Sequence, residues 1–399
     1  MHDVAIVGGG LAGTAAALTL AQQGANVGLI ERQPAAVMAA EDLDGRTTAI
    51  AAGARAMLER LGLWQTLEPQ AEPIWDIRVS DRQSLLHLHF AHQNVGDQPM
   101  GHIVENFRLR RALLDAVEQE PKIACYWETE LESFESEDDC ASLVLKGGQV
   151  VSAPLAVAAD GRGSSLRRFA GIGVRALDYR QSGIVCVVAH EFPHDGVAHE
   201  RFLDGGPFAI LPMTADAEGR HRSSIVWTEP RMLAERLVSL PADDLLKELS
   251  ARFGDFLGRL EITSECTLFP FSLTIAQRLT KPRLVLLGEA GHGIHPIAGQ
   301  GFNVSIRDIE CLAALAGEAL EMGHDLGERA MLSRYAKQRW PDILAMAAAT
   351  DVLNRLFLSN LPPLAVGRRI GMAAINRLPM VKRQFQRHAM GVSLFPRPF

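Results

Sequence analysis

The stretch that decides the fold is DVAIVGGGLAG at residues 3–13. Its apolar start is typical of a strand buried in a parallel sheet, and the alanine-rich segment at 11–23 is helical in character. Glycines at Gly8, Gly10 and Gly13 remove side chains from a tight turn, from the approach to a pyrophosphate and from the contact between helix and strand. The helix then directs free N–H groups and a partial positive charge at the phosphate. We predict a dinucleotide-binding turn.

A second predicted strand, residues 27–30, ends on Glu31. A carboxylate at this place can accept hydrogen bonds from ribose hydroxyls, and it suits an adenosine ribose without a 2′-phosphate. A solvated strand terminus is the alternative. The residues expected to contact the nucleotide here are Gly8, Gly10, Leu11, Ala12, Gly13, Glu31 and Arg32.

Composition narrows the class of protein. The 399 residues suffice for two or three packed units, and hydrophobic and charged fractions of 47% and 22% are those of a folded globular chain. A net charge of -7 argues against a general nucleic-acid binder. The five cysteines are scattered without a C-x-x-C pair, so we expect reduced thiols in the cytoplasm and no disulfide framework. No stretch offers the roughly 18 uninterrupted apolar residues of a membrane-spanning helix.

No metal site is expected from the sequence. His292 and His295 stand three apart in a glycine-rich loop without a third ligand nearby, so each is interpreted as structural or pocket-lining. The sequence also lacks a G-x-S-x-G nucleophile elbow, so hydrolase chemistry is unsupported.

The order of predicted elements indicates an α/β protein. Helices are expected at 55–67 and 109–118, and buried strands at 155–159 and 283–287, with a sheet and one helical insert at 241–253 between them. We infer a discontinuous Rossmann-like nucleotide-binding domain, an inserted mixed β-sheet domain for the substrate and a helical C-terminal region. The predicted boundaries are 1–73, 91–179 and 276–335 for the first, 74–90 and 180–275 for the second, and 336–399 for the third.

Two later motifs carry a resemblance to a known family. The strand predicted at 155–159 is followed by DGRGSSLR at 160–167. The strand predicted at 283–287 is followed by GEAGHGIHPIAGQGFN at 288–303, and this motif continues to Arg307 and Asp308. The chain resembles the class A flavin monooxygenases, the group of p-hydroxybenzoate hydroxylase, and the second motif resembles the ubiquinone-biosynthesis hydroxylases within that class. Smaller matches are RTTAI at 46–50, LGLW at 61–64, Glu105 and Asn106 with Arg110 and Leu113, and GPFAILP at 206–212. The resemblance implies FAD in the Rossmann-like domain and NAD(P)H as a transient reductant.

The resemblance also implies site residues. In the family the D-G motif lies near FAD and the nicotinamide, and the glycine-rich loop and the helix after it lie against the isoalloxazine ring. The FAD contacts implied in this way are Arg46, Arg110, Asp160, Gly161, Gly288, Glu289, Pro296, Gly299, Gln300, Gly301, Phe302 and Asn303. The expected pocket residues are His295, Pro296, Phe208 and Leu211, and no catalytic residue is assigned. Alternatives are an ordinary turn at Asp160 and Gly161, a solvated helix charge at Arg110, and core positions for Phe208 and Leu211.

One position departs from the family pattern. Where the family has aspartate at the ribityl chain of FAD, this chain has Glu289, which is one methylene longer. Retraction of the side chain or a bridging water would preserve the contact.

The implied function is hydroxylation of the aromatic ring of a polyprenylated phenol in ubiquinone biosynthesis. In the family's cycle NAD(P)H reduces FAD, reduced flavin traps O2 as a C4a-hydroperoxide, and the distal oxygen passes to the ring, while the protein excludes water and positions the ring. A hydroxylase or reductase of another apolar substrate is one alternative. A non-catalytic subunit of a quinone-biosynthesis complex is the other.

The C-terminal region mixes apolar and basic side chains over residues 353–388. This composition suits a cytoplasmic protein that contacts the inner membrane peripherally or joins a quinone-biosynthesis complex, and a packed helix with a charged outer face is the alternative. The partners expected are a lipophilic aromatic substrate and O2, without nucleic acid, and a homo-oligomer is left open.

Overall fold

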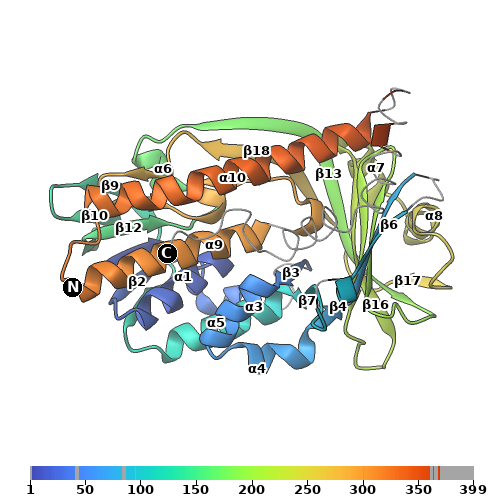
Figure 1. Ribbon diagram of the computed structural model, residues 1–399, viewed down its shortest axis with the longest axis horizontal. Helices are drawn as coiled ribbons and strands as arrows, with labels where there is room; N and C mark the ends of the chain where they lie inside the picture. Colours follow the sequence, from blue (N-terminus) through green and yellow to red (C-terminus); the bar gives the residue numbers. More distant parts are fainter. Residues whose placement is uncertain are drawn as a thin grey trace.

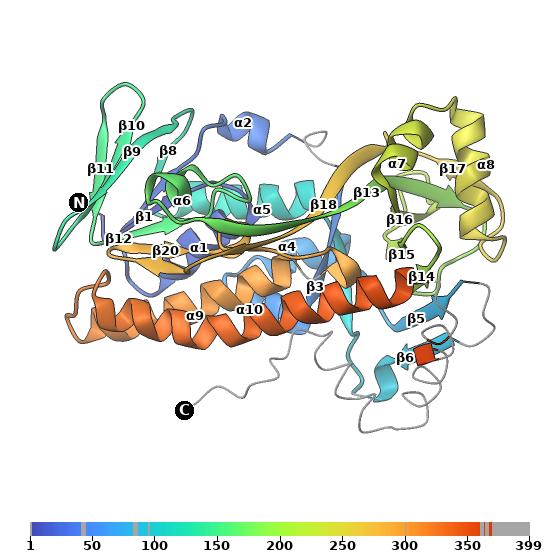
Figure 2. The same ribbon diagram turned by 90° about the horizontal axis from the view of Figure 1, so that it is seen from above.

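The computed structural model describes residues 2–40, 45–82, 87–94, 96–299 and 301–359, together with 363, 367 and 368. Two sheet regions lie at opposite ends of the long axis, and a long helix runs beside both of them (Figure 1, Figure 2). The fold is the predicted α/β class.

A six-stranded sheet in the order β19-β20-β12-β1-β2-β8 forms one end of the molecule. All its strands are parallel except the antiparallel edge strand β19. The strands are β1 (Val4–Val7), β2 (Val27–Ile30), β8 (Ile123–Tyr126), β12 (Leu155–Ala158), β19 (Thr280–Lys281) and β20 (Leu284–Leu286). The predicted strand, helix, strand unit at the start of the chain is confirmed, with α1 (Leu11–Gln22) between β1 and β2.

Both faces of this sheet are buried. Val4 and Ile6 pack into a core with helices, whereas Ala5 and Val7 pack into a separate core on the opposite face. The helices of the first core include α1, α5 (Asn106–Gln119) and α9 (Gly301–Glu321). The second core contains β9 (Leu131–Ser136), β10 (Ala141–Leu145), β11 (Val150–Ala153) and α6 (Ser165–Phe169). Burial on both sides explains why every position of β1 is apolar.

A nine-stranded sheet forms the other end, in the order β21-β18-β13-β16-β15-β14-β5-β6, with β17 paired to β13. Its strands are β5 (Asp76–Asp81), β6 (His87–Ala91), β13 (Val174–His190), β14 (Val197–Phe202), β15 (Pro207–Met213), β16 (His221–Pro230), β17 (Leu260–Ile262), β18 (Thr267–Ala276) and β21 (His292–Gly293). The helices α7 (Arg231–Val238) and α8 (Ala242–Phe253) cover its outer face (Figure 2). The inner face is turned toward the nucleotide-binding region.

Besides the three-stranded sheet of β9, β10 and β11, a small sheet connects the two ends. It has the order β3-β7-β4, from β3 (Thr47–Ala51), β4 (Glu72–Ile74) and β7 (Gly101–Glu105). The helix predicted over 55–67 is wrong as one element, because α3 (Ala52–Arg60) ends before Gly62 and α4 (Trp64–Leu67) begins after it. Gly62 has a φ of 73°, a left-handed conformation that ends helices. The short α2 (Ala35–Met38) precedes this sheet.

Two long elements cross the predicted domain boundaries. β13 is 17 residues long and contains an irregularity between Asp178 and Ser182. The helix α10 (Arg329–Leu358) is 30 residues long and lies beside α9 before reaching the nine-stranded sheet (Figure 2). The boundaries expected at 179/180 and 335/336 therefore fall inside continuous elements, and the division into domains stays a prediction.

A buried ion network joins α9, α10 and the loop after β20. The carboxylate of Asp308 is fully buried; its Oδ2 accepts from His292 Nε2 at 2.6 Å and from the Gly288 N–H at 3.0 Å, and its Oδ1 accepts from Arg339 Nε at 2.7 Å. Arg339 also pairs with Asp342 at 2.8 Å. Burial raises the pKa of Asp308, but His292 and Arg339 outweigh it and bring the pKa to about 2. Of the two interpretations given for His292, structural or pocket-lining, its hydrogen bond to Asp308 supports the structural one.

We expect Asp308→Asn to lower the free energy of unfolding by about 3–5 kcal/mol, the usual cost of removing one partner from a buried ion network. Because the folded pKa lies below the ordinary value, the stabilisation is present above about pH 4 and is lost as the pH falls toward 2. Thermal unfolding at pH 7, 5 and 3 should show a gap from the wild type that narrows with acid. Glu321→Gln, on the exposed end of α9, is the control, and equal melting temperatures at pH 7 would contradict the assignment.

Candidate functional site

A cavity of about 1130 Å³ lies between the two ends of the molecule. Its wall comes from the glycine turn at 10–12, from β3, from the loop and first turn of α9 within 294–303, and from the inner face of the nine-stranded sheet. Most of the side chains on this wall are apolar. The cavity is thus built by segments far apart in the sequence.

The glycine turn has the shape that a bound pyrophosphate needs. Gly8 has a φ of 109°, and a Cβ added there would lie 2.5 Å from the carbonyl oxygen of Ala159. A Cβ on Gly13 would lie 1.8 Å from the carbonyl oxygen of Gly8. A Cβ on Gly10 would meet no atom of the described chain within 4 Å, because this residue faces the open cavity at the start of α1. Gly8 and Gly13 are thus required by the fold itself, whereas Gly10 leaves room for a ligand.

The carboxylate of Glu31 accepts a hydrogen bond from the backbone of this turn. Its Oε2 accepts from the Gly9 N–H at 2.6 Å and its Oε1 from the Gln33 N–H at 2.9 Å. The side chain is buried, so the alternative of a solvated strand terminus is wrong. Each carboxylate oxygen keeps a further lone pair for a ribose hydroxyl. The neighbouring Arg32 is exposed.

The two carboxylate oxygens of Asp160 differ in their hydrogen bonds. Oδ2 accepts from the Ser165 N–H at 2.6 Å, the Ser165 hydroxyl at 2.9 Å and the Leu166 N–H at 3.2 Å, so it caps α6. Oδ1 is buried and has no hydrogen-bond partner among the residues described. Gly161, with a φ of 76°, lies on the cavity wall beside it. The Asp-Gly pair is therefore a turn, and it leaves one unpaired, buried acceptor directly behind the part of the wall that Ala159 and Gly161 form.

The first turn of α9 lies on the cavity wall. Gly301, Phe302 and Asn303 line the cavity, so the helix N-terminus with its free N–H groups faces it. The Asn303 amide is engaged by β3: its Oδ1 accepts from the Ala51 N–H at 3.0 Å and its Nδ2 donates to the Ala49 carbonyl at 2.8 Å. Gln300, predicted as a cofactor contact, lies outside the described residues.

His295 is fully buried and lines the cavity, as Pro296 does. Its ring lies edge-on to Tyr179 and Phe271, with centroids 4.9 Å and 5.0 Å away. Burial, assisted by the charge of Arg162, lowers the pKa of His295 to about 4, so the ring is neutral. Neither ring nitrogen has a hydrogen-bond partner within the described chain.

Glu289 makes an ion pair at the cavity wall. Its Oε1 accepts from Arg162 Nε at 3.1 Å and from Nη2 at 3.0 Å, and both residues line the cavity. The longer side chain thus reaches the arginine that follows the Asp-Gly pair. The sequence reasoning did not single out Arg162, although its place in the DGR motif was a signal.

The remaining predicted residues divide between wall and core. Arg46 lines the cavity with its guanidinium 4.8 Å from the centroid of the Phe269 ring, and Gly299 lines it with a φ of 61°. Arg110 is buried and donates to the Ala40 carbonyl at 3.4 Å, so the alternative of a solvated helix charge is wrong. Gly288, with a φ of 58°, lies off the wall and donates its N–H to Asp308.

The position predicted for Phe208 is wrong. The sequence placed it in the pocket, but it is fully buried against Trp227 in the core beneath α7 and α8. Side chains alternate along a strand, so Pro207, Ala209 and Leu211 of β15 line the cavity while Phe208 points the other way.

Sequence reasoning missed the far end of the cavity. Apolar residues of β5, β6 and β14 line it together with Leu353, Leu356 and Phe357 from the end of α10. Arg368 closes this end: its Nε donates to Asp81 at 3.2 Å, and its Nη1 donates to the carbonyls of Leu356 and Ser359. Most of the basic and apolar residues singled out beyond 359 lie outside the described residues.

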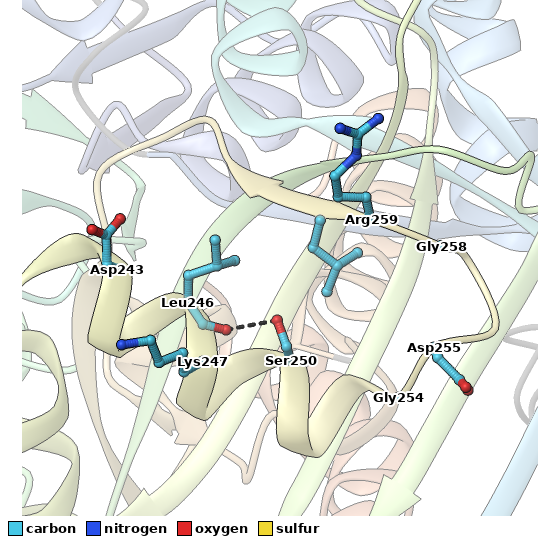
Figure 3. Close-up of a pocket in the computed structure, with 9 residues that line it drawn as sticks. Asp243, Leu246, Lys247, Ser250, Gly254, Asp255, Gly258 and Arg259 are labelled. Carbon is cyan, nitrogen blue, oxygen red and sulfur yellow. Dashed lines mark hydrogen bonds between the residues drawn. The ribbon is translucent and has the colours of Figure 1, made fainter.

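A second hollow lies away from this cavity, between α8 and the segment leading to β17 (Figure 3). It is open, and its polar groups are used locally: Ser250 Oγ donates to the Leu246 carbonyl at 2.7 Å (Figure 3), and Lys247 pairs with Asp244 at 2.8 Å. It lies on the side of the sheet opposite the glycine turn, so we assign it no part in the site.

The described residues offer neither a metal site nor a membrane-spanning helix. They contain no cluster of three or more histidine, cysteine or acidic side chains that could hold a metal ion. They also contain no helix with the length and apolar character needed to cross a membrane.

The FAD binding domain family model matches residues 1–350, most of the chain. The chain belongs to this family. FAD is therefore its cofactor, and the glycine turn and the N-terminus of α9 fit it, because they present backbone N–H groups to a space that protein atoms leave free.

The similarity of the chain to curated relatives and to solved structures is consistent with this assignment. The chain is 43% identical over 397 residues to the ubiquinone hydroxylase UbiL of Rhodospirillum rubrum, covering 99% of this chain and 91% of that protein. It is 33% identical over 392 residues to the 3-demethoxyubiquinol 3-hydroxylase of Escherichia coli, covering 98% of each. The crystal structure of p-nitrophenol 4-monooxygenase PnpA from Pseudomonas putida superimposes with a TM-score of 0.79 at 17% identity, covering 99% of each chain. That structure shares the fold.

Gly10→Ala is expected to separate cofactor binding from folding. The added methyl group meets no protein atom but occupies the space beside the turn, so the apoprotein should keep its melting temperature while the Kd for FAD rises by at least about tenfold. Gly13→Ala is the contrasting variant, because its methyl group collides with backbone and should lower the melting temperature itself. Fluorescence titration with FAD and thermal unfolding report the two effects, and unchanged FAD affinity in Gly10→Ala would refute the placement.

Glu289→Asp is expected to retain FAD at least as well as the wild type. The shorter side chain restores the length that the family uses, and the partly exposed pair with Arg162 contributes only about 0–1 kcal/mol. Flavin absorbance per mole of purified protein measures the occupancy, with Arg162→Gln as the companion variant that breaks the same pair. A large loss of flavin in Glu289→Asp would show that the glutamate is specifically accommodated.

Proposed function

We propose that this protein is an FAD-dependent monooxygenase that hydroxylates the aromatic ring of a polyprenylated phenol in ubiquinone biosynthesis, using O2 and NAD(P)H. The observation that carries the proposal is the single cavity, which reaches from the glycine turn to an apolar region between the nine-stranded sheet and α10. One enclosure can thus take the cofactor at one end and a lipophilic substrate at the other. The two curated relatives named above support the choice of ring hydroxylation.

The protein's own part in the reaction is binding, orientation and exclusion of water. When bound, FAD supplies the redox chemistry by accepting a hydride equivalent from NAD(P)H and activating O2. The N–H groups at the start of α9 face the cavity and would stabilise negative charge that develops at the cofactor. The apolar side chains of β5, β14 and β15 would hold the substrate and keep water from the reacting atoms.

The residues proposed to hold FAD follow from their positions. Gly10, Leu11 and Ala12 would contact the pyrophosphate and Glu31 the ribose, while Asp160, Glu289, Gly299 and residues 301–303 would surround the rest of the cofactor. NAD(P)H would dock transiently, because the sequence contains no second G-x-G-x-x-G turn.

The apolar end of the cavity also bears on where the substrate comes from. A polyprenylated phenol partitions into the bilayer, and the end of α10 that lines the cavity carries exposed Val352 and Leu353. We propose that the protein collects its substrate by peripheral contact with the inner membrane or within a quinone-biosynthesis complex.

The test is product analysis with isotopically labelled O2. Purified protein with FAD, NAD(P)H and a farnesylated phenol is expected to oxidise NAD(P)H in a phenol-dependent manner and to yield a ring-hydroxylated product with one labelled oxygen atom, detected by mass spectrometry. A reduced product without label would instead favour a reductase. Flavin reduction without any phenol-dependent turnover would favour a non-catalytic subunit.

A further inference from the structure

Glu200 is an acid on the substrate-facing side of the nine-stranded sheet. It lies in β14 between Ala198 and Phe202, and all three line the cavity. Its register partners are Val79 of β5 and Ala209 of β15, which line the cavity too. The carboxyl group therefore stands in an otherwise apolar stretch of wall.

Other charged groups on the cavity wall have partners, and Glu200 does not. Arg162 pairs with Glu289, Arg368 pairs with Asp81, and Arg46 lies over Phe269. Within the described part of the chain, Glu200 makes no hydrogen bond and no ion pair. The other ionisable residues on the wall of this side are His199, the neighbour of Glu200 on β14, and His295. Burial lowers the pKa of each to about 4, so both rings are neutral.

An unpartnered carboxyl group in such a place costs stability. The side chain is half-buried, and its desolvation raises the pKa of Glu200 to about 7, so the charged form is disfavoured in the folded protein. An uncharged side chain of the same size would avoid that cost. Groups that are unfavourable for folding and line a site are candidates for function.

We propose that Glu200 binds the hydroxyl group of the aromatic substrate and holds its proton during oxygen transfer. This inference rests on the proposed function. A carboxylate oxygen of Glu200 accepts the phenolic proton, which leaves the electron pair of the O–H bond on the phenolate oxygen and raises electron density on the ring. After the ring carbon has gained its oxygen, that carbon loses its own proton to solvent, and Glu200 returns the first proton to the phenolate oxygen. The carboxyl group is thus unchanged over the cycle.

The geometry explains why the substrate's hydroxyl group would hydrogen-bond to Glu200. A phenol entering the apolar end brings one polar group, and an unpaired buried hydroxyl is costly. Along β5, β14 and β15, Glu200 is the strong acceptor that the cavity offers, so it fixes the ring's orientation as well as its charge. The prenyl chain is left among the apolar side chains.

The experiment compares a farnesylated phenol with its methyl ether in wild type, Glu200→Gln and Glu200→Asp holoprotein. Glu235→Gln, an exposed substitution on α7, is the matched control. For the phenol we expect Glu200→Gln to keep its FAD and lose about 10²–10⁴-fold in kcat/KM, the range of a general acid–base contribution, with partial rescue by Glu200→Asp. The methyl ether has no proton to give, so Glu200→Gln should change its kinetics little.

The pH dependence gives a second readout. Activity of the wild type should rise as the pH passes through about 7, and Glu200→Gln should lack this rise. Because the folded pKa is raised, the favourable contribution of the neutral acid is present at low pH and is lost as the pH rises through 7. Glu200→Gln should therefore gain melting temperature relative to wild type at pH 8 and gain much less at pH 5, just above the ordinary pKa of 4.5.

Binding separates this inference from the proposed function. Perturbation of the flavin absorbance gives the Kd of each ligand, and wild type should prefer the phenol to the ether whereas Glu200→Gln should not. If wild type forms no oxygenated product but shows this preference, the proposed function fails and Glu200 stands as the hydroxyl-binding group. Unchanged preference, pH profile and kcat/KM in a folded Glu200→Gln variant would overturn the inference.

Discussion

The carboxylate of Asp308 holds together the three segments on which the site depends. It bonds to His292 and Gly288 in the loop after β20, lies on α9, and pairs with Arg339 of α10. The loop leads into the part of the wall beside the glycine turn, α9 presents its N-terminus there, and α10 ends at the apolar side. Since each partner of a buried charge is costly to lose, these segments are fixed relative to one another.

The cavity follows a consistent electrostatic pattern. At its polar end, backbone N–H groups and paired side chains surround the cofactor space, and the charges of Arg162 and Glu289 satisfy each other. At its apolar end, Arg368 and Asp81 form a buried pair that closes the wall without leaving a free charge. Against this pattern of satisfied charges, Glu200 stands out as the acid on the wall that has no partner among the described residues.

What could be predicted from the sequence was what short-range geometry dictates. The unit from β1 to β2 was predictable because the turn glycines, the buried strand and the helix are all local features. The break at Gly62 was missed because the amphipathic pattern continues across it. Phe208 was misplaced because a strand's alternation fixes which residues share a face but not which face meets the cavity. The pair between Arg162 and Glu289 and the position of Glu200 arise only when distant segments meet, so no local pattern reveals them.

The length of α10 gives the molecule a mechanical property. Arg339, in the ion network, and Phe357, beside the apolar end of the cavity, are separated along one continuous helix by about 27 Å at the usual rise per residue. Pro341 lies two residues beyond Arg339 and has no backbone N–H to donate to the preceding turn, so the helix can bend there. A bend at Pro341 would let the tip of α10 move to admit a long chain while Arg339 stays paired with Asp308.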